Sequence, residues 1–308
     1  MVQRCELCPR RCGVNRASDP RGYCRAGSRP QVYRFGPHTG EEPPVSGTRG
    51  SGTVFFSRCT LRCLYCQNFP WSQDGLGSEC ASEELSDILR TLHAAGCHNW
   101  NLVSPTPWLP WIAEAATRLA KDGVRLPFVY NTSGYERIET LEAFAQLGDV
   151  YLTDLRYADP ATAAEASDAP DYVVIAREAV RRMWRTRGAL RVDANGNATS
   201  GVICRILVLP GRAGEAIANL RWLADTLGTE IAVSLMSQYV PTHRAVTLDG
   251  WNRRVTAAEY GAVRDELERL GFSEGWVQEL NAETSPELIG YHMPAGGDRG
   301  GLTERDIA

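Results

Sequence analysis

The sequence predicts an α/β protein built on an open, partial (β/α)6 barrel. Short segments rich in β-forming residues alternate with longer segments whose apolar residues recur at three- and four-residue spacing, the pattern of amphipathic helices. Six such β–α repeats predict a parallel sheet with right-handed crossovers. They occupy roughly 240 residues, which is short for a closed eight-fold barrel. The chain of 308 residues has room for one such domain and a small appendage.

The repeats can be placed along the chain. The expected strands cover residues 52–57, 98–104, 126–131, 149–154, 202–209 and 231–236. The expected helices cover residues 82–95, 110–122, 135–147, 172–187, 213–227 and 256–270. The first helix opens well, because Ser82 is followed by Glu84. In the helix over 172–187, arginines alternate with apolar residues, which indicates one solvated face.

Three regions are expected. Residues 1–50 form a cysteine-rich N-terminal module with a Pro/Gly-rich connector, irregular over 31–51, residues 51–280 form the barrel, and residues 281–308 form a C-terminal tail. The first forty residues carry eight arginines against Glu6 and Asp19. These arginines either balance metal-bound thiolates, the interpretation we favour, or form a docking face for an anionic partner.

Composition narrows the functional classes. A hydrophobic fraction of 43% suits a folded core, and a net charge of −4 gives no basic field for nucleic acid. The sequence has no run of about 18 apolar residues and no apolar signal region at its start, so a cytoplasmic protein without membrane partners is expected. Ten cysteines in a reducing cytosol favour metal ligation over disulfides.

The run CTLRCLYCQN places Cys59, Cys63 and Cys66 in a C-x3-C-x2-C spacing directly after the first expected strand. Three thiolates in one short loop can hold three irons of a cubic [4Fe–4S] cluster and leave the fourth iron open to a molecule with amino and carboxylate groups. Zinc ligands, by contrast, usually come as paired C-x2-C units. The spacing, with Tyr65 before the last cysteine, resembles the signature of the radical S-adenosylmethionine (radical SAM) superfamily.

The resemblance extends along nearly the whole chain. It is carried in order by CELCPRRCGVNR, GYCRAG, EEPPVSGTRGSGTVFFSRCTLRCLYCQN, HNWNLVSPTP, VYNTSGYE, YLTDLRYAD and LVLPG. Together these segments are similar to the proteins related to pyruvate formate-lyase activating enzyme, the PflX-like iron–sulfur branch. The branch is also similar to the radical sugar epimerase proposed to turn a glucosyl unit into a mannosyl unit in avilamycin assembly.

The resemblance implies that Cys59, Cys63 and Cys66 ligate the cluster. Contacts to the cosubstrate SAM are implied for polar residues at successive strand ends: Tyr65 beside the adenine, Ser104 and Thr106 at the methionine amino group, Asn131, Thr132, Ser133 and Asp154 (with Arg156 in the same run) at a monovalent cation, and Arg205 at the carboxylate. Each residue also has an ordinary structural interpretation. Asp154 could cap a turn, and Arg205 could pair with a carboxylate.

A second cysteine group and one further thiol complete the candidate site. Cys5, Cys8, Cys12 and Cys24 have the spacing C-x2-C-x3-C-x11-C, which suits either tetrahedral zinc or a second iron–sulfur cluster. Cys204 is a candidate hydrogen-atom donor to a substrate radical. Strand alternation, however, points Cys204 to the face opposite Arg205.

Three functions follow from the resemblance. In the first, a flavodoxin- or ferredoxin-type donor reduces the cluster, SAM is cleaved, and the 5′-deoxyadenosyl radical takes hydrogen from a small molecule such as an oligosaccharide, with epimerisation in natural-product tailoring as one outcome. The second is an activase that generates a glycyl radical on a partner enzyme. Arg58 where the branch often has glycine, and Ile206 where it often has histidine, argue against that. A non-enzymatic iron–sulfur carrier would leave the strand-end polar residues without a purpose.

Overall fold

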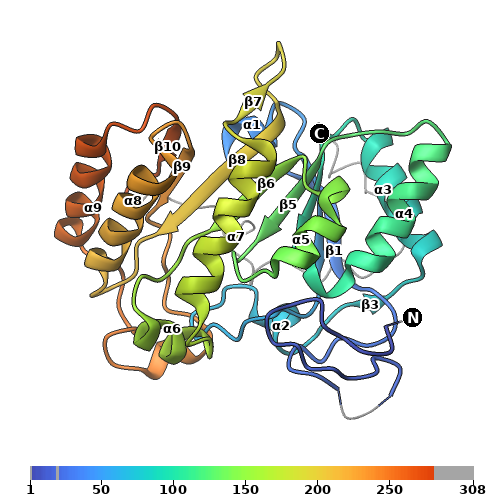
Figure 1. Cartoon of the computed structure of the whole chain (residues 1–308), viewed down its shortest axis with the longest axis horizontal. Helices are drawn as coiled ribbons and strands as arrows, with labels where there is room; N and C mark the ends of the chain where they lie inside the picture. The colour runs from blue at the N-terminus through green and yellow to red at the C-terminus, as the bar shows by residue number, and fades with distance from the viewer. Residues whose placement is uncertain (1, 19–20, 281–308) are drawn as a thin grey trace.

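The computed structural model of the chain describes residues 2–18 and 21–280, and helices cover one face of its single main sheet (Figure 1). The strands are β1 (Gln31–His38), β2 (Ser51–Phe56), β3 (Ser78–Glu79), β4 (Trp100–Val103), β5 (Phe128–Thr132), β6 (Val150–Asp154), β7 (Arg191–Val192), β8 (Ala198–Leu207), β9 (Ala232–Met236) and β10 (Gly275–Val277). The α-helices are α1 (Pro43–Ser46), α2 (Phe69–Ser72), α3 (Ser82–Ala94), α4 (Leu109–Lys121), α5 (Ile138–Ala143), α6 (Pro160–Ser167), α7 (Tyr172–Arg187), α8 (Ala213–Leu227) and α9 (Ala257–Leu270). Short 3-10 turns lie at η1 (Thr106–Trp108), η2 (Ala145–Leu147) and η3 (His243–Thr247).

The sheet is an open barrel of parallel strands. Its order is β10-β9-β8-β6-β5-β4-β2-β1-β3, and β7 pairs with β8 off this path. Neighbours from β2 to β10 are parallel, whereas β1 is antiparallel to β2 and β3 is antiparallel to β1. All six expected strands are present, and each expected helix follows its strand. The predicted α/β fold, a partial (β/α)6 barrel, is therefore confirmed.

The two faces of the sheet carry different cores. Tyr130 and Val202 join the main apolar core under the helices, whereas Val129 and Ile203 form a smaller apolar cluster on the concave face with Val45 of α1. The alternation follows from the two-residue period of a strand. By the same period, the carboxyl end of the concave face presents residues 131, 154 and 205.

The connector differs from its prediction. Residues 31–51 were expected to be irregular, but they contain β1 and α1. β1 tolerates Pro37 because this part of the strand pairs with β2 on one side only, and proline lacks the N–H that a second neighbour would need. The division into a module and a barrel stays a prediction, and the tail 281–308 lies outside the described residues.

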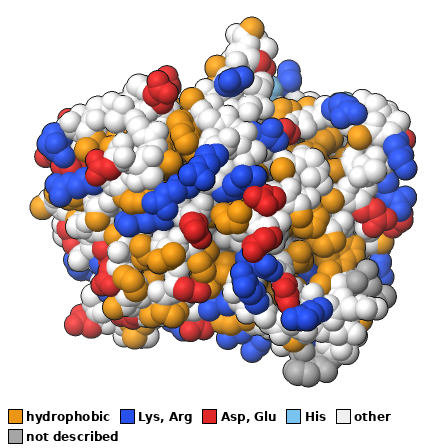
Figure 2. Space-filling model, in the orientation of Figure 1, with side chains coloured by type: hydrophobic (Ala, Val, Ile, Leu, Met, Phe, Trp, Pro, Cys, Tyr) orange, Lys and Arg blue, Asp and Glu red, His pale blue; other side chains and the backbone are white. Residues whose placement is uncertain are grey.

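Helix α7 has the expected solvated face. Its buried residues are Tyr172, Val173, Ala176, Ala179, Val180 and Met183, and a row of basic side chains crosses the surface over this helix (Figure 2). Two of these arginines, Arg177 and Arg181, place their guanidinium groups over the ring of Trp222. No helix in the described residues is both long enough and apolar enough to span a membrane.

Candidate cluster and cosubstrate site

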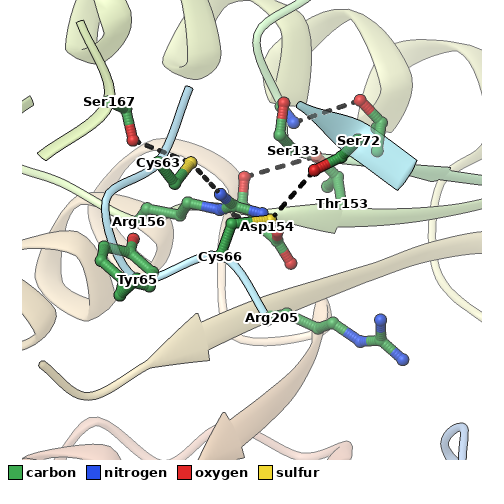
Figure 3. Close-up of polar contacts among 12 residues, drawn as sticks. Cys63, Tyr65, Cys66, Ser72, Ser133, Thr153, Asp154, Arg156, Ser167 and Arg205 are labelled. Carbon is green, nitrogen blue, oxygen red and sulfur yellow. Dashed lines mark hydrogen bonds and ion pairs between the residues drawn. The ribbon is translucent and has the colours of Figure 1, made fainter. Parts of the chain in front are cut away.

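The cysteine loop that follows β2 is braced by hydrogen bonds to its sulfur atoms (Figure 3). The Sγ of Cys63 accepts a hydrogen bond from Nη1 of Arg156 and another from Oγ of Ser167, each at 2.9 Å. The Sγ of Cys66 lies 3.3 Å from Oγ of Ser72. Donors aimed at sulfur favour thiolate, and such contacts are the usual surroundings of metal-bound cysteines.

The three cysteines of the loop can be thiolates together only if positive charge lies beside them. Burial, followed by the nearby Cys63, raises the pKa of Cys59 to about 12 and that of Cys66 to about 11. Three thiolates in one short, largely desolvated loop repel one another, so they are stable together only when cations compensate their charge. The irons of a cluster supply such charge, so the donor set fits a [4Fe–4S] group. In the described residues, no three Cys, His, Asp or Glu side chains are arranged to hold a single metal ion.

Asp154 and Arg156, expected beside a cation, form an ion pair at the end of β6. Nε and Nη2 of Arg156 lie 2.9 and 2.5 Å from Oδ2 of Asp154, while Nη1 of the same guanidinium reaches Cys63. Burial acts to lower the pKa of Arg156, but the charges of Asp154 and Cys63 raise it well above its usual value. The positive charge beside Asp154 in this structure is thus a guanidinium that also touches the cysteine loop.

Tyr65 is packed against protein groups on both its ring and its hydroxyl. The ring stacks on Trp251 with centroids 5.6 Å apart, and the hydroxyl lies 2.7 Å from that of Tyr157. The hydroxyl of Tyr157 in turn lies 2.6 Å from Oγ of Ser167, which donates to Cys63. The hydroxyl of Tyr65 is therefore linked through Tyr157 and Ser167 to the Sγ of Cys63. Its contact with adenine stays a prediction.

The strand-end polar residues divide between two places. Oγ1 of Thr106 and of Thr132 both donate to Oε1 of Glu136 at 2.5 Å. Asn131 instead donates to Glu41 on the concave face, at 3.3 Å. The remaining two contribute backbone contacts: the N–H of Ser104 donates to the carbonyl of residue 131, and the carbonyl of Ser133 accepts from the hydroxyl of Tyr172. Thr106 and Thr132 thus meet at Glu136, whereas the side chain of Asn131 lies on the other face of β5.

Glu136 is a buried acidic residue beside the candidate site that the sequence did not single out. Its side chain is 2% exposed, and its Oε2 has no hydrogen-bond partner among the described residues. Burial raises its pKa from 4.5 to about 7, against the lowering effect of the hydroxyl donors. The only signal in the sequence is the glutamate that closes VYNTSGYE, two residues after a glycine turn.

Replacing Glu136 by glutamine is expected to remove a pH-dependent penalty on stability. Because the folded pKa is raised from 4.5 to about 7, the wild type loses stability as the pH rises through this window. The shift corresponds to about 3 kcal/mol above pH 7. Thermal unfolding of Glu136→Gln should therefore match the wild type near pH 5 and exceed it at pH 8, whereas Glu142→Gln, an exposed change, should show no such trend. A difference that shrinks with rising pH would contradict this.

Arg205 is held by two carboxylates from the connector. Its Nε and Nη2 lie 2.7 and 2.6 Å from the carboxylate of Glu42, and Nη2 also donates to Glu41. Figure 3 shows the guanidinium pointing away from the cysteine loop. This matches the alternative in which Arg205 pairs with a carboxylate. A contact with the SAM carboxylate would require the guanidinium to leave these partners.

Cys204 lies on the helix-facing side of β8. It is fully buried and belongs to the main apolar core. Burial raises the pKa of its thiol above the usual value. The alternation expected from the sequence thus holds, and the thiol is not offered to a substrate on the concave face.

The four N-terminal cysteines are gathered by tight backbone turns. The N–H of Cys5 donates to the carbonyl of Val14, and the Sγ of Cys12 accepts from the N–H of Tyr23, next to Cys24. A Cβ built on Gly22 would lie 2.8 Å from the Sγ of Cys12, so a larger residue there would displace that thiol. Burial, followed by the neighbouring Cys24, raises the pKa of Cys8. The described side chains are not arranged around a single ion, so a metal in this module stays a prediction, with zinc and an iron–sulfur cluster as its two alternatives.

Arginines fasten this module to the loops that follow β2, β4 and β5. Arg10 donates to the carbonyl of Thr60, Arg16 to that of Pro107, and Arg137 of the barrel to that of Glu6. Burial lowers the pKa of Arg16, while the nearby cysteines oppose this shift. The module therefore covers the carboxyl ends of three neighbouring strands, and at least Arg16 lies where it can balance thiolate charge.

One protein of known sequence is similar to most of this chain. No protein-family model matches the chain. An uncharacterized protein of Methanocaldococcus jannaschii is 28% identical over 269 residues, which cover 84% of this chain and 72% of that protein.

Two solved structures are similar in shape. The FeFe-hydrogenase maturase HydG of Carboxydothermus hydrogenoformans matches with a TM-score of 0.51 at 14% identity, covering 78% of this chain. This chain spans only 55% of the HydG chain. A domain of the pyruvate-formate lyase-activating enzyme of Bacteroides vulgatus matches with a TM-score of 0.39 at 15% identity, over 56% of this chain and 91% of that domain. The likeness to HydG shows a shared fold.

Proposed function

We propose that this chain is a radical SAM enzyme that takes a hydrogen atom from a small-molecule substrate. The observation that carries the proposal is the loop of Cys59, Cys63 and Cys66 at the carboxyl edge of a partial barrel, with Arg156 and Ser167 donating to Cys63. Ligands of parallel α/β folds bind at this edge. The three-cysteine spacing leaves one iron of a bound [4Fe–4S] cluster for SAM.

Cys59, Cys63 and Cys66 would hold the cluster, which, once reduced by a low-potential donor of the flavodoxin or ferredoxin type, would supply the electron for cleavage of SAM into methionine and a 5′-deoxyadenosyl radical. The chain positions the reactants and keeps water away. Arg156 stabilises the charge on Cys63, and Asp154 holds that guanidinium in place. The N-terminal module, which covers the neighbouring strand ends, restricts access of solvent to the loop.

A small cavity beside the loop favours a small-molecule substrate over a protein partner. It has a volume of about 250 Å³ and is lined by residues that include Cys59, Gln73 and His243. His243 stacks on Phe69, which holds its ring at the rim. A substrate carbon placed there would lie next to the cluster loop. Epimerisation of a sugar carbon is one outcome of such chemistry, and activation of a glycyl-radical enzyme is the alternative function.

The two functions are separated by anaerobic turnover in D2O. The reconstituted protein is incubated with SAM, a reductant and candidate oligosaccharides, and the products are analysed for deuterium and inverted configuration. We expect deuterium at one inverted carbon when the quenching hydrogen exchanges with solvent. A radical that forms only on a glycyl-radical partner protein would assign the alternative function instead.

Replacing Ser167 by alanine is expected to make the midpoint potential of the loop cluster more negative. The variant removes one of the two donors to the Sγ of Cys63, and hydrogen bonds to cluster ligands stabilise the more negative, reduced state. A potentiometric titration followed by electron paramagnetic resonance measures the shift. Ser86→Ala is the matched control, because this buried serine bonds within α3. Equal potentials in the Ser167 variant and the wild type would contradict the assignment.

A further inference from the structure

An arginine-lined cavity lies between the N-terminal module and the cysteine loop. Its volume is about 790 Å³, within the range of small-molecule sites. Its lining consists of Arg21, Gly22, Tyr23, Arg25, Arg58, Arg62 and Asp74. Four guanidinium groups thus face one carboxylate across an open cavity. We call this the arginine cavity.

Three of the four arginines that line the cavity are not paired with a carboxylate in the described residues. Arg62 donates to the carbonyl of Tyr23 at 2.7 Å and lies over its ring, and Arg58 donates to the side-chain carbonyl of Gln31 at 3.2 Å. These partners are neutral groups. In the described part of the chain, Arg25, Arg58 and Arg62 form no ion pair. These three arginines alone carry the inference: neutral partners fix the direction of the Arg58 and Arg62 guanidinium groups and leave their charge for a ligand.

Two of these arginines occupy backbone positions that suit glycine. The φ angles of Arg25 and Arg58 are 57° and 74°, in the left-handed region. A side chain there costs about 1–2 kcal/mol relative to the right-handed region. Space is also kept for Arg58, because a Cβ on Gly75 would lie 2.1 Å from its Cζ. Such strain persists where the side chain has a use, and both side chains line the same cavity.

The arginine cavity adjoins the cluster loop. The smaller cavity of about 250 Å³ shares Tyr23, Arg25, Arg62 and Asp74 with it and extends to Cys59. A ligand anchored in the arginine cavity can therefore reach toward the loop where hydrogen abstraction would occur.

We propose that the arginine cavity binds a phosphate group carried by the small-molecule substrate. Planar guanidinium forks match the oxygens of phosphate, and several of them suit its double charge better than they suit a single carboxylate. The concave shape favours a small molecule over an acidic protein surface. That the phosphate belongs to the substrate rests on the proposed function, whereas binding of a phosphate group in this cavity does not.

The test is calorimetric titration of the reconstituted full-length protein with inorganic phosphate at constant ionic strength. We expect Arg58→Gly and Arg25→Gly each to weaken binding about tenfold or more, since each removes a charge-assisted contact. Glycine suits both backbone positions, so the variants are expected to fold. Asp74→Asn should tighten binding, because it removes the one carboxylate that the described residues contribute to the lining. The matched control is Arg11→Gly, which also has a positive φ, of 41°, but lies outside the cavity.

Several outcomes would overturn the assignment. Among these are no saturable phosphate binding by the wild type, equal affinities in Arg58→Gly and Arg11→Gly, or weaker binding by Asp74→Asn. Capture of an acidic flavodoxin by the wild type alone, without phosphate binding, would reassign the cavity to protein docking. Cleavage of SAM is measured on the same preparations. Phosphate binding without SAM cleavage would uphold the anion site and refute the proposed function, and the reverse result would refute only the anion site.

Discussion

Replacing Arg205 by methionine is expected to lower the free energy of unfolding by about 3–5 kcal/mol, the usual cost of breaking a buried ion pair from one side. The side chains of Glu41 and Glu42 are only 8% and 5% exposed, and the variant leaves both carboxylates without a cation. Burial acts to raise the pKa of Glu41, but Arg205 holds it below its usual range. The unfolding temperature should therefore fall by about 5–8 °C at neutral pH.

A triple variant separates this structural role from a role in cosubstrate binding. Arg205→Met combined with Glu41→Gln and Glu42→Gln removes the charges together and should recover most of the lost stability. All unfolding temperatures are compared at one scan rate, because unfolding of a cluster protein is commonly irreversible. An Arg205→Met protein that keeps its unfolding temperature but loses affinity for SAM would show that the arginine serves the SAM carboxylate instead.

Replacing Cys63 by alanine is expected to remove the loop cluster, which corresponds to about four irons per chain, and to bring SAM cleavage to background. One of three protein ligands is lost, and with it the sulfur that Arg156 and Ser167 contact. Iron analysis and absorption spectra after anaerobic reconstitution measure the loss. Cys97→Ala is the matched control, because this buried cysteine packs in the main apolar core.

The same experiment tests whether the N-terminal module holds a metal and which one. Cys12→Ala should release either zinc or iron without removing the loop cluster, and the element released decides between the two alternatives. A Cys63→Ala protein with wild-type iron content and SAM cleavage would refute the ligand assignment. A Cys12→Ala protein with unchanged metal content would refute a metal in the module.

Much of the barrel could be predicted from the sequence because its signals are local. Each parallel strand is a short apolar run. In each following helix, apolar residues recur every three or four positions, as in the helix that begins at Ser82. β1 escaped prediction because Pro37 and nearby glycines suggest a loop, although an edge position tolerates them. α6 was missed despite the Asp159-Pro160 start, where the aspartate caps the helix.

The candidate site was predictable only in its cysteines. Cys59, Cys63 and Cys66 lie within one loop, so their spacing can be read directly from the sequence. The partners of the site come from distant segments: Ser167 reaches Cys63 across 104 residues, and Glu42 reaches Arg205 across 163. Strand alternation did place Cys204 away from Arg205 correctly. No sequence period indicates that Arg205 pairs with the connector or that Thr106 and Thr132 meet at Glu136.

The central claim is that the cysteine loop supports reductive cleavage of SAM. The most direct measurement is anaerobic incubation of the reconstituted wild type with SAM and dithionite, followed by quantification of 5′-deoxyadenosine and methionine. The account predicts that both products form in equal amounts and only in the presence of reductant. Unchanged SAM with dithionite, with titanium(III) citrate and with reduced flavodoxin, in a protein whose loop holds its four irons, would contradict it.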